Sequence, residues 1–159
     1  MVIREIFPWK ITYDYEATRK VYAQINVGDP ERCGCEHCLN FAAVRDEVYP
    51  REVRKVFEEI GIDYRKESEV YHLYKISPGS HEYGGWFNFI GGVEYIDESY
   101  RPSKEKPGLL KYVTVSESFS WFFSDYRVEA CHKAFSNQPI VQIDFNAIVP
   151  WVLKAKEPD

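Results

Sequence analysis

The chain has 159 residues, a formal net charge of −5 at pH 7 and a sequence pI of about 5.5, and its length predicts a single globular domain spanning residues 1–159. The excess of 25 acidic over 20 basic residues argues against nucleic acid as a partner, because phosphate binding requires clustered lysine and arginine. The sequence shows neither a signal peptide nor an apolar run of the ~20 residues that a membrane span needs, so we expect a cytoplasmic protein that does not bind membranes.

Aromatic residues make up 16% of the chain, and this composition favours a β-rich protein because aromatic side chains are enriched in strands. The first predicted elements are two strands, at residues 9–15 and 21–27, where apolar and polar side chains alternate. We expect them to pair as an antiparallel hairpin with its turn around residues 17–19. Pro30 ends this region, since proline cannot continue a central strand.

Two helices are predicted next, at residues 36–48 and 51–60. Pro50 separates them, because a proline inside a helix removes a backbone donor. Gly61 follows the second helix at the position where glycine favours a helix C-terminus. An apolar stripe with the spacing i, i+3, i+4, i+7 runs along the second helix, formed by Val53, Val56, Phe57 and Ile60.

The remainder of the chain is predicted to be mainly strands, at residues 70–76, 83–90, 93–96, 109–115, 119–123 and 140–148. Gly91 and Gly92 suit a two-residue hairpin turn between two of them. A short helix is predicted at residues 128–135. This order lacks β-α-β alternation and therefore predicts an α+β fold, with an antiparallel sheet of about six to eight strands and the helix pair 36–48 and 51–60 packed on one face.

Three short motifs span most of the chain: Cys33-Gly34-Cys35 with Cys38-x-Asn40-Phe41, then Tyr83-Gly84-Gly85-Trp86-Phe87, then Val149-Pro150-Trp151-Val152-Leu153. Through these motifs the chain resembles a family of small bacterial cytoplasmic proteins for which no activity is established. The resemblance therefore implies no catalytic residue.

The most unusual stretch is the segment 33–38, Cys-Gly-Cys-Glu-His-Cys. Cysteines in a reducing compartment are more often metal ligands or reactive thiols than disulfide partners. Thiolate is the preferred structural ligand of Zn²⁺, so Cys33, Cys35 and Cys38 are the predicted ligands of a structural Zn²⁺. Cys33 can join the other two only if Gly34 adopts a backbone conformation that other residues resist. A tetrahedral site needs a fourth ligand, and the candidates are Cys131, His132, His37, His72 and His81.

The same cysteines allow three other interpretations. Cys35 and Cys38 form a C-x-x-C pair at the start of a helix, where the helix N-terminus and Arg32 lower a thiol pKa while nearby glutamates raise it; such a pair is typical of a thiol oxidoreductase. A zinc with an open coordination position would indicate a metal-dependent hydrolase. The cysteines can also pack simply as small buried hydrophobic residues.

Polar residues elsewhere give weaker signals. His72 and Asn88 lie in successive predicted strands, and if these strands pair the two side chains would share a face and line a ligand pocket; more often such a histidine is hydrogen-bonded in or near a core. Asp144 is expected on the solvent face of the last strand. The sequence contains no Gly-x-Ser-x-Gly, no His-Glu-x-x-His and no phosphate-binding loop.

These observations predict a noncatalytic binding module with a structural Zn²⁺ at Cys33, Cys35 and Cys38 that ties the first hairpin to the first helix. The expected partner is a protein or a small-molecule ligand. The aromatic excess also fits a homo-oligomer interface, where tryptophan and tyrosine are enriched.

Overall fold

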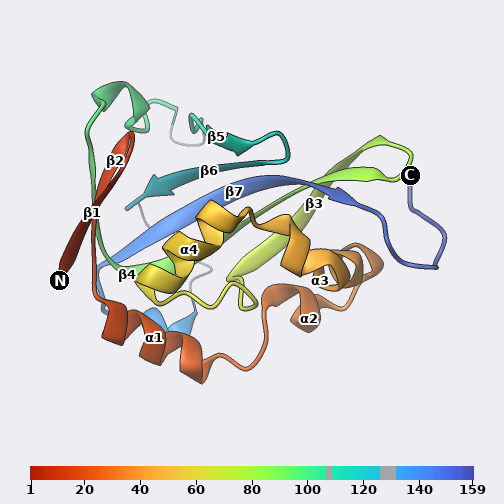
Figure 1. Ribbon diagram of the computed structural model, residues 1–159, viewed down its shortest axis with the longest axis horizontal. Helices are drawn as coiled ribbons and strands as arrows, with labels where there is room; N and C mark the ends of the chain where they lie inside the picture. The colour runs from red at the N-terminus through yellow and green to blue at the C-terminus, as the bar shows by residue number, and fades with distance from the viewer. Residues whose placement is uncertain (107–108, 126–131) are drawn as a thin grey trace.

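The computed structural model describes residues 1–106, 109–125 and 132–159 (Figure 1). Within them, one antiparallel sheet contains seven strands: β1 (Val2–Ile6), β2 (Trp9–Tyr13), β3 (Glu69–Ser77), β4 (Ser80–Tyr95), β5 (Val113–Ser116), β6 (Phe119–Ser124) and β7 (Ile140–Pro150). The strand order is β1-β2-β4-β7-β6-β5, and β3 pairs with β4. The predicted α+β fold is confirmed.

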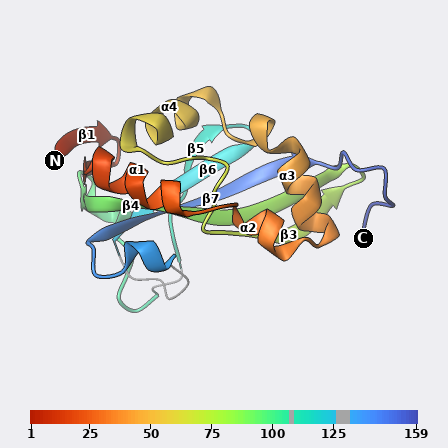
Figure 2. The same cartoon turned by 90° about the horizontal axis from the view of Figure 1, so that it is seen from below.

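Four α-helices lie in the first part of the chain: α1 (Tyr15–Gln24), α2 (Asp29–Cys33), α3 (Glu36–Val48) and α4 (Arg51–Ile60). The bounds of α3 and α4 are those predicted from Pro50 and from the apolar stripe. Gly61 ends α4 in the left-handed conformation, with φ 98°. Figures 1 and 2 show α1, α3 and α4 on the same side of the sheet, so the helix pair covers one sheet face as predicted.

Aromatic rings fill the space between the helices and the sheet. Tyr49, which ends α3, is buried and has four ring neighbours from α4, β4, β6 and β7, at centroid distances between 5.5 and 5.9 Å: Phe57, Phe87, Phe119 and Phe145. Such edge-to-face contacts stabilise a core beyond the burial of area alone. Much of the aromatic excess is therefore core.

The first hairpin is not where the alternating pattern predicted it. It consists of β1 and β2, whereas residues 15–24 form helix α1. Asp14 caps this helix by accepting a hydrogen bond from the N–H of Ala17, a stronger signal for a helix start than a short alternation is for a strand. Thr18, Val21 and Tyr22 then share the buried face of α1, and this i, i+3, i+4 spacing overrides the alternation.

The predicted turn at Gly91 and Gly92 is also wrong, because β4 continues through both glycines to Tyr95. At this point β4 changes neighbours: Gly91 to Tyr95 pair with β2, while residues 80–86 pair with β3 on the same side. A Cβ atom on Gly91 would overlap the carbonyl oxygen of Thr12. The glycine is required for close approach of two strands and not for a turn.

The later elements are shorter or longer than predicted. The strand predicted at 109–115 begins only at Val113, and β7 extends to Pro150. The first half of the helix predicted at 128–135 lies outside the described residues; its end, Lys133–Phe135, is a 3₁₀ turn. Among the helices in the described ranges, none combines the length and apolar character needed to cross a bilayer.

Candidate metal centre

A tight turn between two helices brings the three cysteines together. The short helix α2 ends at Cys33, and Gly34 follows in the left-handed conformation with φ 68° and ψ 7°, its N–H donating to the carbonyl of Pro30. Cys35 is then the N-cap residue of α3, and Cys38 lies in the first turn of that helix. Gly34 thus has the kind of backbone conformation that the sequence analysis expected if Cys33 is to lie with the other two cysteines.

The sulfur atoms of Cys33, Cys35 and Cys38 all lie within 4.8 Å of one another. Each is a free thiol; Cys33 and Cys35 are exposed, whereas Cys38 is buried. Tetrahedral zinc with Zn–S bonds of about 2.3 Å places its sulfur ligands about 3.8 Å apart. The cluster can therefore hold a metal ion with only small side-chain rotations.

The thiols differ in acidity. Burial acts to raise the pKa of Cys35, but the backbone N–H groups of Cys38 and His37 and the neighbouring thiols outweigh it, and the net pKa is lowered. Burial raises the pKa of Cys38, and the thiols of Cys33 and Cys35 raise it further. The turn thus pairs one exposed, more acidic thiol with one buried, less acidic thiol.

An ionic network that is buried at Arg45 and Glu67 and exposed at Glu31 fixes the position of α2, and with it Cys33. Arg45 on α3 donates to both carboxylate oxygens of Glu31 on α2 and, at 2.9 Å, to both oxygens of Glu67 before β3. Tyr49 donates a further hydrogen bond to Glu67 at 2.7 Å. Asp29 accepts from the backbone N–H of Val70 at 2.9 Å. The cysteine turn is therefore attached to the sheet through α2 as well as α3.

Beside the cysteines, three histidines meet from three different elements: His37 on α3, His72 on β3 and His81 on β4. One ring nitrogen of each lies within 4.8 Å of the others. His72 Nε2 is 2.8 Å from His81 Nδ1, and the His37 ring stacks on the His72 ring with centroids 3.8 Å apart. Burial and the two neighbouring histidines lower the pKa of His72 to about 4, so the His72 side chain is predominantly neutral at pH 7.

The segment after β7 closes the histidine cluster. The side chain of Asn40 on α3 donates to the carbonyl of Pro150 at 3.0 Å and accepts from the N–H of Val152 at 2.7 Å. Between them, the Trp151 ring lies 5.5 Å from His81 and 6.1 Å from His37, measured between centroids. Glu157 then accepts from the N–H of Gly79 and lies 2.6 Å from His81 Nε2.

The three sequence motifs therefore converge in one region. The first supplies the cysteines and Asn40, the third supplies Trp151, and Tyr83 of the second donates a hydrogen bond at 2.8 Å to the carbonyl of His37. Gly84 of the second motif is needed for close packing, because a Cβ atom there would lie 2.6 Å from the Tyr71 ring. This convergence marks the region around α3, β3, β4 and the C-terminal segment as the candidate functional site.

The predicted fourth ligands have different positions. His37, His72 and His81 form their own group, separate from the sulfur atoms. His132 caps the 3₁₀ turn at 133–135, where its Nδ1 accepts from the N–H of Ala134. Cys131 lies outside the described residues, so the identity of the fourth ligand stays a prediction.

The strands that carry His72 and Asn88 pair, but the two side chains do not share a face as predicted. His72 lies opposite Tyr83, and Asn88 instead accepts a hydrogen bond at 2.8 Å from Ser68. The sequence does not identify Glu157, because nothing near it signals a role. Its partner, His81, has one cue in the sequence: the turn at Pro78 and Gly79, which brings the strands carrying His72 and His81 side by side.

The face of the sheet opposite the core carries a second buried polar group. Asp144 is buried there, contrary to the expected solvent position, and both of its carboxylate oxygens accept from Gln142 Nε2. Burial raises the pKa of Asp144 to about 6. Four buried atoms on β4, β6 and β7 lack a hydrogen-bond partner within residues 1–106, 109–125 and 132–159: Trp86 Nε1, Asn88 Nδ2, Ser124 Oγ and Gln142 Oε1. Alternation along β7 predicts a solvent-facing residue at 144 but does not predict what covers that face.

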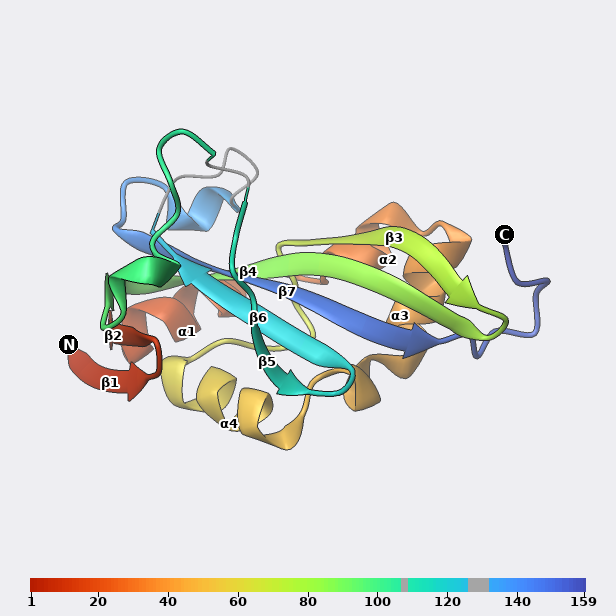
Figure 3. The same cartoon turned by 90° about the horizontal axis from the view of Figure 1, so that it is seen from above.

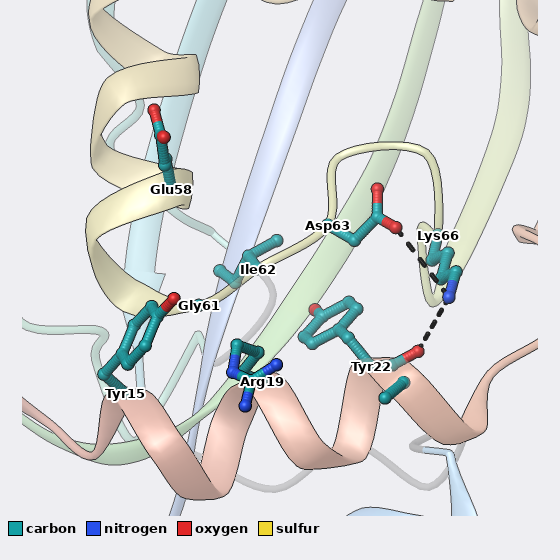
Figure 4. Close-up of a pocket in the computed structure, with 9 residues that line it drawn as sticks. Tyr15, Arg19, Tyr22, Glu58, Gly61, Ile62, Asp63 and Lys66 are labelled. Atoms are coloured by element: carbon teal, nitrogen blue, oxygen red, sulfur yellow. Dashed lines mark hydrogen bonds and ion pairs between the residues drawn. The ribbon is translucent and has the colours of Figure 1, made fainter.

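A cavity of about 280 Å³ lies between α1 and the end of α4 (Figure 4). The Lys66 ammonium donates to the carbonyl of Tyr22 at 2.9 Å and lies 3.8 Å from the carboxylate of Asp63. The cation thus has partners within the fold, and the cavity is a weaker candidate than the Cys and His clusters.

Comparison with protein-family models, with curated proteins and with solved structures finds no match to this chain.

Proposed function

We propose that this protein is a noncatalytic metal-binding domain in which Cys33, Cys35 and Cys38 hold one Zn²⁺. The observation that carries the proposal is the grouping of three thiols within 4.8 Å by a left-handed glycine and a helix N-terminus. Three thiolates in one turn suit a zinc ion better than they suit a hard cation, which prefers oxygen ligands.

Zinc at this position would join the end of α2 to the start of α3. It would not join the first hairpin to a helix, as the sequence suggested, because that hairpin is β1–β2 and precedes α1. All three ligands lie within six residues, so the cross-link closes only a short loop and removes little entropy from the unfolded chain. Water, Cys131, His132 or a residue of a partner would complete the tetrahedron.

A binding role for this end of the molecule is supported by exposed apolar side chains on α3 and β3. Leu39, in the first turns of α3, is 46% exposed, and Leu73 and Ile76 on β3 are 43% and 45% exposed. In Figure 3, β3 lies along one margin of the sheet next to α2. A cytoplasmic protein or small-molecule ligand that contacts these side chains is the proposed partner.

A second candidate function is thiol oxidoreduction, favoured by the acidity difference between Cys35 and Cys38. The Cys35 thiolate would attack a substrate disulfide and release one substrate thiolate, and Cys38 would then displace the second. The products are a Cys35–Cys38 disulfide and a substrate reduced by two electrons, with the protons taken from the Cys35 and Cys38 thiols. This reaction requires that both thiols are free of metal.

Elemental analysis of the tag-free protein, combined with thiol titration, tests the proposal. We expect zinc, with Cys33, Cys35 and Cys38 unreactive until a chelator is added. Cys33→Ser should lower the zinc content by one equivalent per chain, and Cys131→Ser should do the same only if Cys131 is the fourth ligand. Reactive thiols and a zinc content that Cys33→Ser leaves unchanged would contradict the proposal; a reversible Cys35–Cys38 disulfide would then favour the oxidoreductase.

A further inference from the structure

The histidine cluster has the composition of a metal site of its own. His37, His72 and His81 come from α3, β3 and β4, and one ring nitrogen of each lies within 4.8 Å of the other two. The nitrogens that face each other are Nε2 of His72 and Nδ1 of His81, 2.8 Å apart. Three imidazoles are a recurrent ligand set for first-row transition ions.

An unpaired nitrogen in the cluster points to a missing ligand. Nδ1 of His37 is buried and has no hydrogen-bond partner among the residues that the structure describes. Buried polar atoms in folded proteins are nearly always paired, and the hydrogen bond between His72 and His81 does not involve His37. A metal ion bound through Nδ1 of His37 would satisfy this atom.

The surroundings of His81 also match a ligated histidine. Its Nε2 lies 2.6 Å from Glu157 Oε1. A proton on Nε2, donated to this carboxylate, leaves the lone pair on Nδ1, the nitrogen that faces His72. Metal-ligating histidines usually donate their second N–H to a carboxylate or carbonyl in this way, which fixes the tautomer.

Metal binding requires a rearrangement of the rings. Ligand nitrogens around a tetrahedral ion with bonds of about 2.0–2.1 Å lie about 3.3 Å apart, so His72 Nε2 would move away from His81 Nδ1 by about 0.5 Å. The His72 ring would also turn out of its stack on His37, where the interplanar angle is 17°, because an imidazole binds a metal along the lone pair that lies in its ring plane. His72 is partly exposed and can do so. The Trp151 ring packs against His81 and His37 and covers the cluster on the side of the C-terminal segment.

We propose that His37, His72 and His81 form a second metal site, separate from the three cysteines, which binds a divalent transition ion such as Zn²⁺, Ni²⁺ or Cu²⁺ through three neutral imidazoles. Glu157 is a positioning residue for His81. This inference goes beyond the proposed function and does not depend on it. Its ligands come from elements distant in sequence, so the bound ion would join α3 to the β3–β4 hairpin and stabilise the whole domain.

Titration of the metal-free, full-length protein with Co²⁺ separates the two sites, because only thiolate ligands add sulfur-to-cobalt charge-transfer bands in the near ultraviolet. The double variant Cys33→Ser/Cys35→Ser should lose those bands and still bind one Co²⁺ at the histidine cluster, with visible ligand-field bands. His72→Phe, which keeps an aromatic ring against His37, should lose this second equivalent of Co²⁺ and retain any thiolate bands. His132→Gln is the matched histidine control and should leave the second equivalent of Co²⁺ bound.

Glu157→Gln should weaken the second equivalent about 10- to 100-fold, as is usual for the carboxylate partner of a ligating histidine. Addition of Co²⁺ should raise the Tm of the Cys33→Ser/Cys35→Ser variant. It should not raise the Tm of the triple variant that also carries His72→Phe. A Cys33→Ser/Cys35→Ser variant that is folded by near-ultraviolet circular dichroism and binds no Co²⁺ would overturn the inference. If the wild-type protein binds Co²⁺ without showing the charge-transfer bands, that result would instead contradict the cysteine site.

Discussion

Asn40 and Val152 lie 112 positions apart in sequence and are joined by a 2.7 Å hydrogen bond from the Val152 N–H to the Asn40 side chain. The same side chain donates to the carbonyl of Pro150. Its amide group therefore makes the two hydrogen bonds, one donated and one accepted, that a neighbouring strand would make with the backbone at the end of β7. This contact holds the segment that carries Trp151 and Glu157 against the start of α3. The Asn and the C-terminal motif, conspicuous separately in the sequence, thus form one structural unit.

Asn40→Ala should destabilise the protein by about 2 kcal/mol, because it removes two hydrogen bonds and leaves the Pro150 carbonyl and the Val152 N–H without partners. Hydrogen exchange at Val152 should accelerate with the loss, while exchange within α4 changes only as global stability changes. Asn26→Ala, at an exposed asparagine, is the control and should leave both quantities near the wild-type values. Unchanged protection at Val152 in Asn40→Ala would show that other contacts hold the segment.

Arg45→Met should be the most destabilising substitution near the cysteines, with a loss of about 3–5 kcal/mol, because it leaves the buried Glu67 carboxylate without its cation. Urea unfolding at pH 7 measures this loss. Arg65→Met is the matched control: Arg65 also pairs with a carboxylate, that of Asp46, but both side chains are more than half exposed, and exposed pairs contribute little. Equal effects of the two substitutions would contradict the assigned role of the buried network.

The sequence predicted those parts of the fold whose signals are local. The helix pair was predicted from Pro50, Gly61 and an apolar stripe. The cysteine cluster was predicted from three cysteines that lie within six residues of one another. The hairpin error has a local cause too: the short alternation at residues 21–27 competes with the cap at Asp14, and the cap identifies the helix. Local pattern is therefore sufficient where one segment contains the whole signal.

The histidine cluster could not be predicted in this way, because its geometry depends on the register of β3 against β4. The pairing of Ser77 with Ser80 would place His72 opposite Gly85, but two register shifts place it opposite Tyr83, nearer to His81. Bulges of this kind leave no reliable mark in a single sequence. The position of Glu157 depends in turn on the fold of the C-terminal segment.

Gly34 allows a test of how far backbone conformation controls the cysteine site. A Cβ atom at this position would meet no described atom within 4 Å, so Gly34→Val acts mainly through its φ of 68°. A left-handed conformation costs an ordinary residue about 1–2 kcal/mol, and the affinity of the cysteines for Co²⁺ should fall about 5- to 30-fold. Gly34→Asn should lose less, since asparagine tolerates this conformation.

The control for Gly34 is Gly79→Val in the β3–β4 turn, where φ is 80° and the space around the Cβ position is equally open. It imposes comparable strain away from the cysteines and should leave their thiolate bands and affinity unchanged. If both valine variants weaken the thiolate site equally, the effect is one of global stability and not of the turn.

Gly91 and Gly92 make a matched pair for the close approach of β4 to β2. Gly91→Ala should destabilise the domain by at least about 2 kcal/mol, because the added methyl group overlaps the Thr12 carbonyl and forces the strands apart. Gly92→Ala should cost less, since its methyl group would meet only the Thr12 hydroxyl, at 3.2 Å, and that group can rotate. Chemical denaturation ranks the two variants, and an equal loss would show that strand separation at Gly91 is not the cause.

Asp144 predicts a stability that depends on pH in a defined direction. Its pKa is raised from 3.8 to about 6 in the folded state, so the folded protein binds this proton more tightly than the unfolded chain does. Stability from this group is therefore present below pH 3.8 and is lost as the pH rises to about 6. The shift of about 2 units corresponds to a penalty of at most about 3 kcal/mol above pH 6.

Asp144→Asn should remove that penalty, because an amide oxygen still accepts from Gln142 and carries no charge to bury. The variant should be more stable than the wild type at pH 7, with a difference that shrinks between pH 6 and pH 4. Among the described residues, Tyr71 on β3 is the other titratable group that interacts with this carboxylate, and it stays neutral throughout this range. Glu105→Gln, at an exposed carboxylate, is the control. A stability difference between Asp144→Asn and wild type that is constant from pH 4 to pH 7 would mean that Asp144 does not titrate there, and that the buried face opposite the core supplies a partner for its charge.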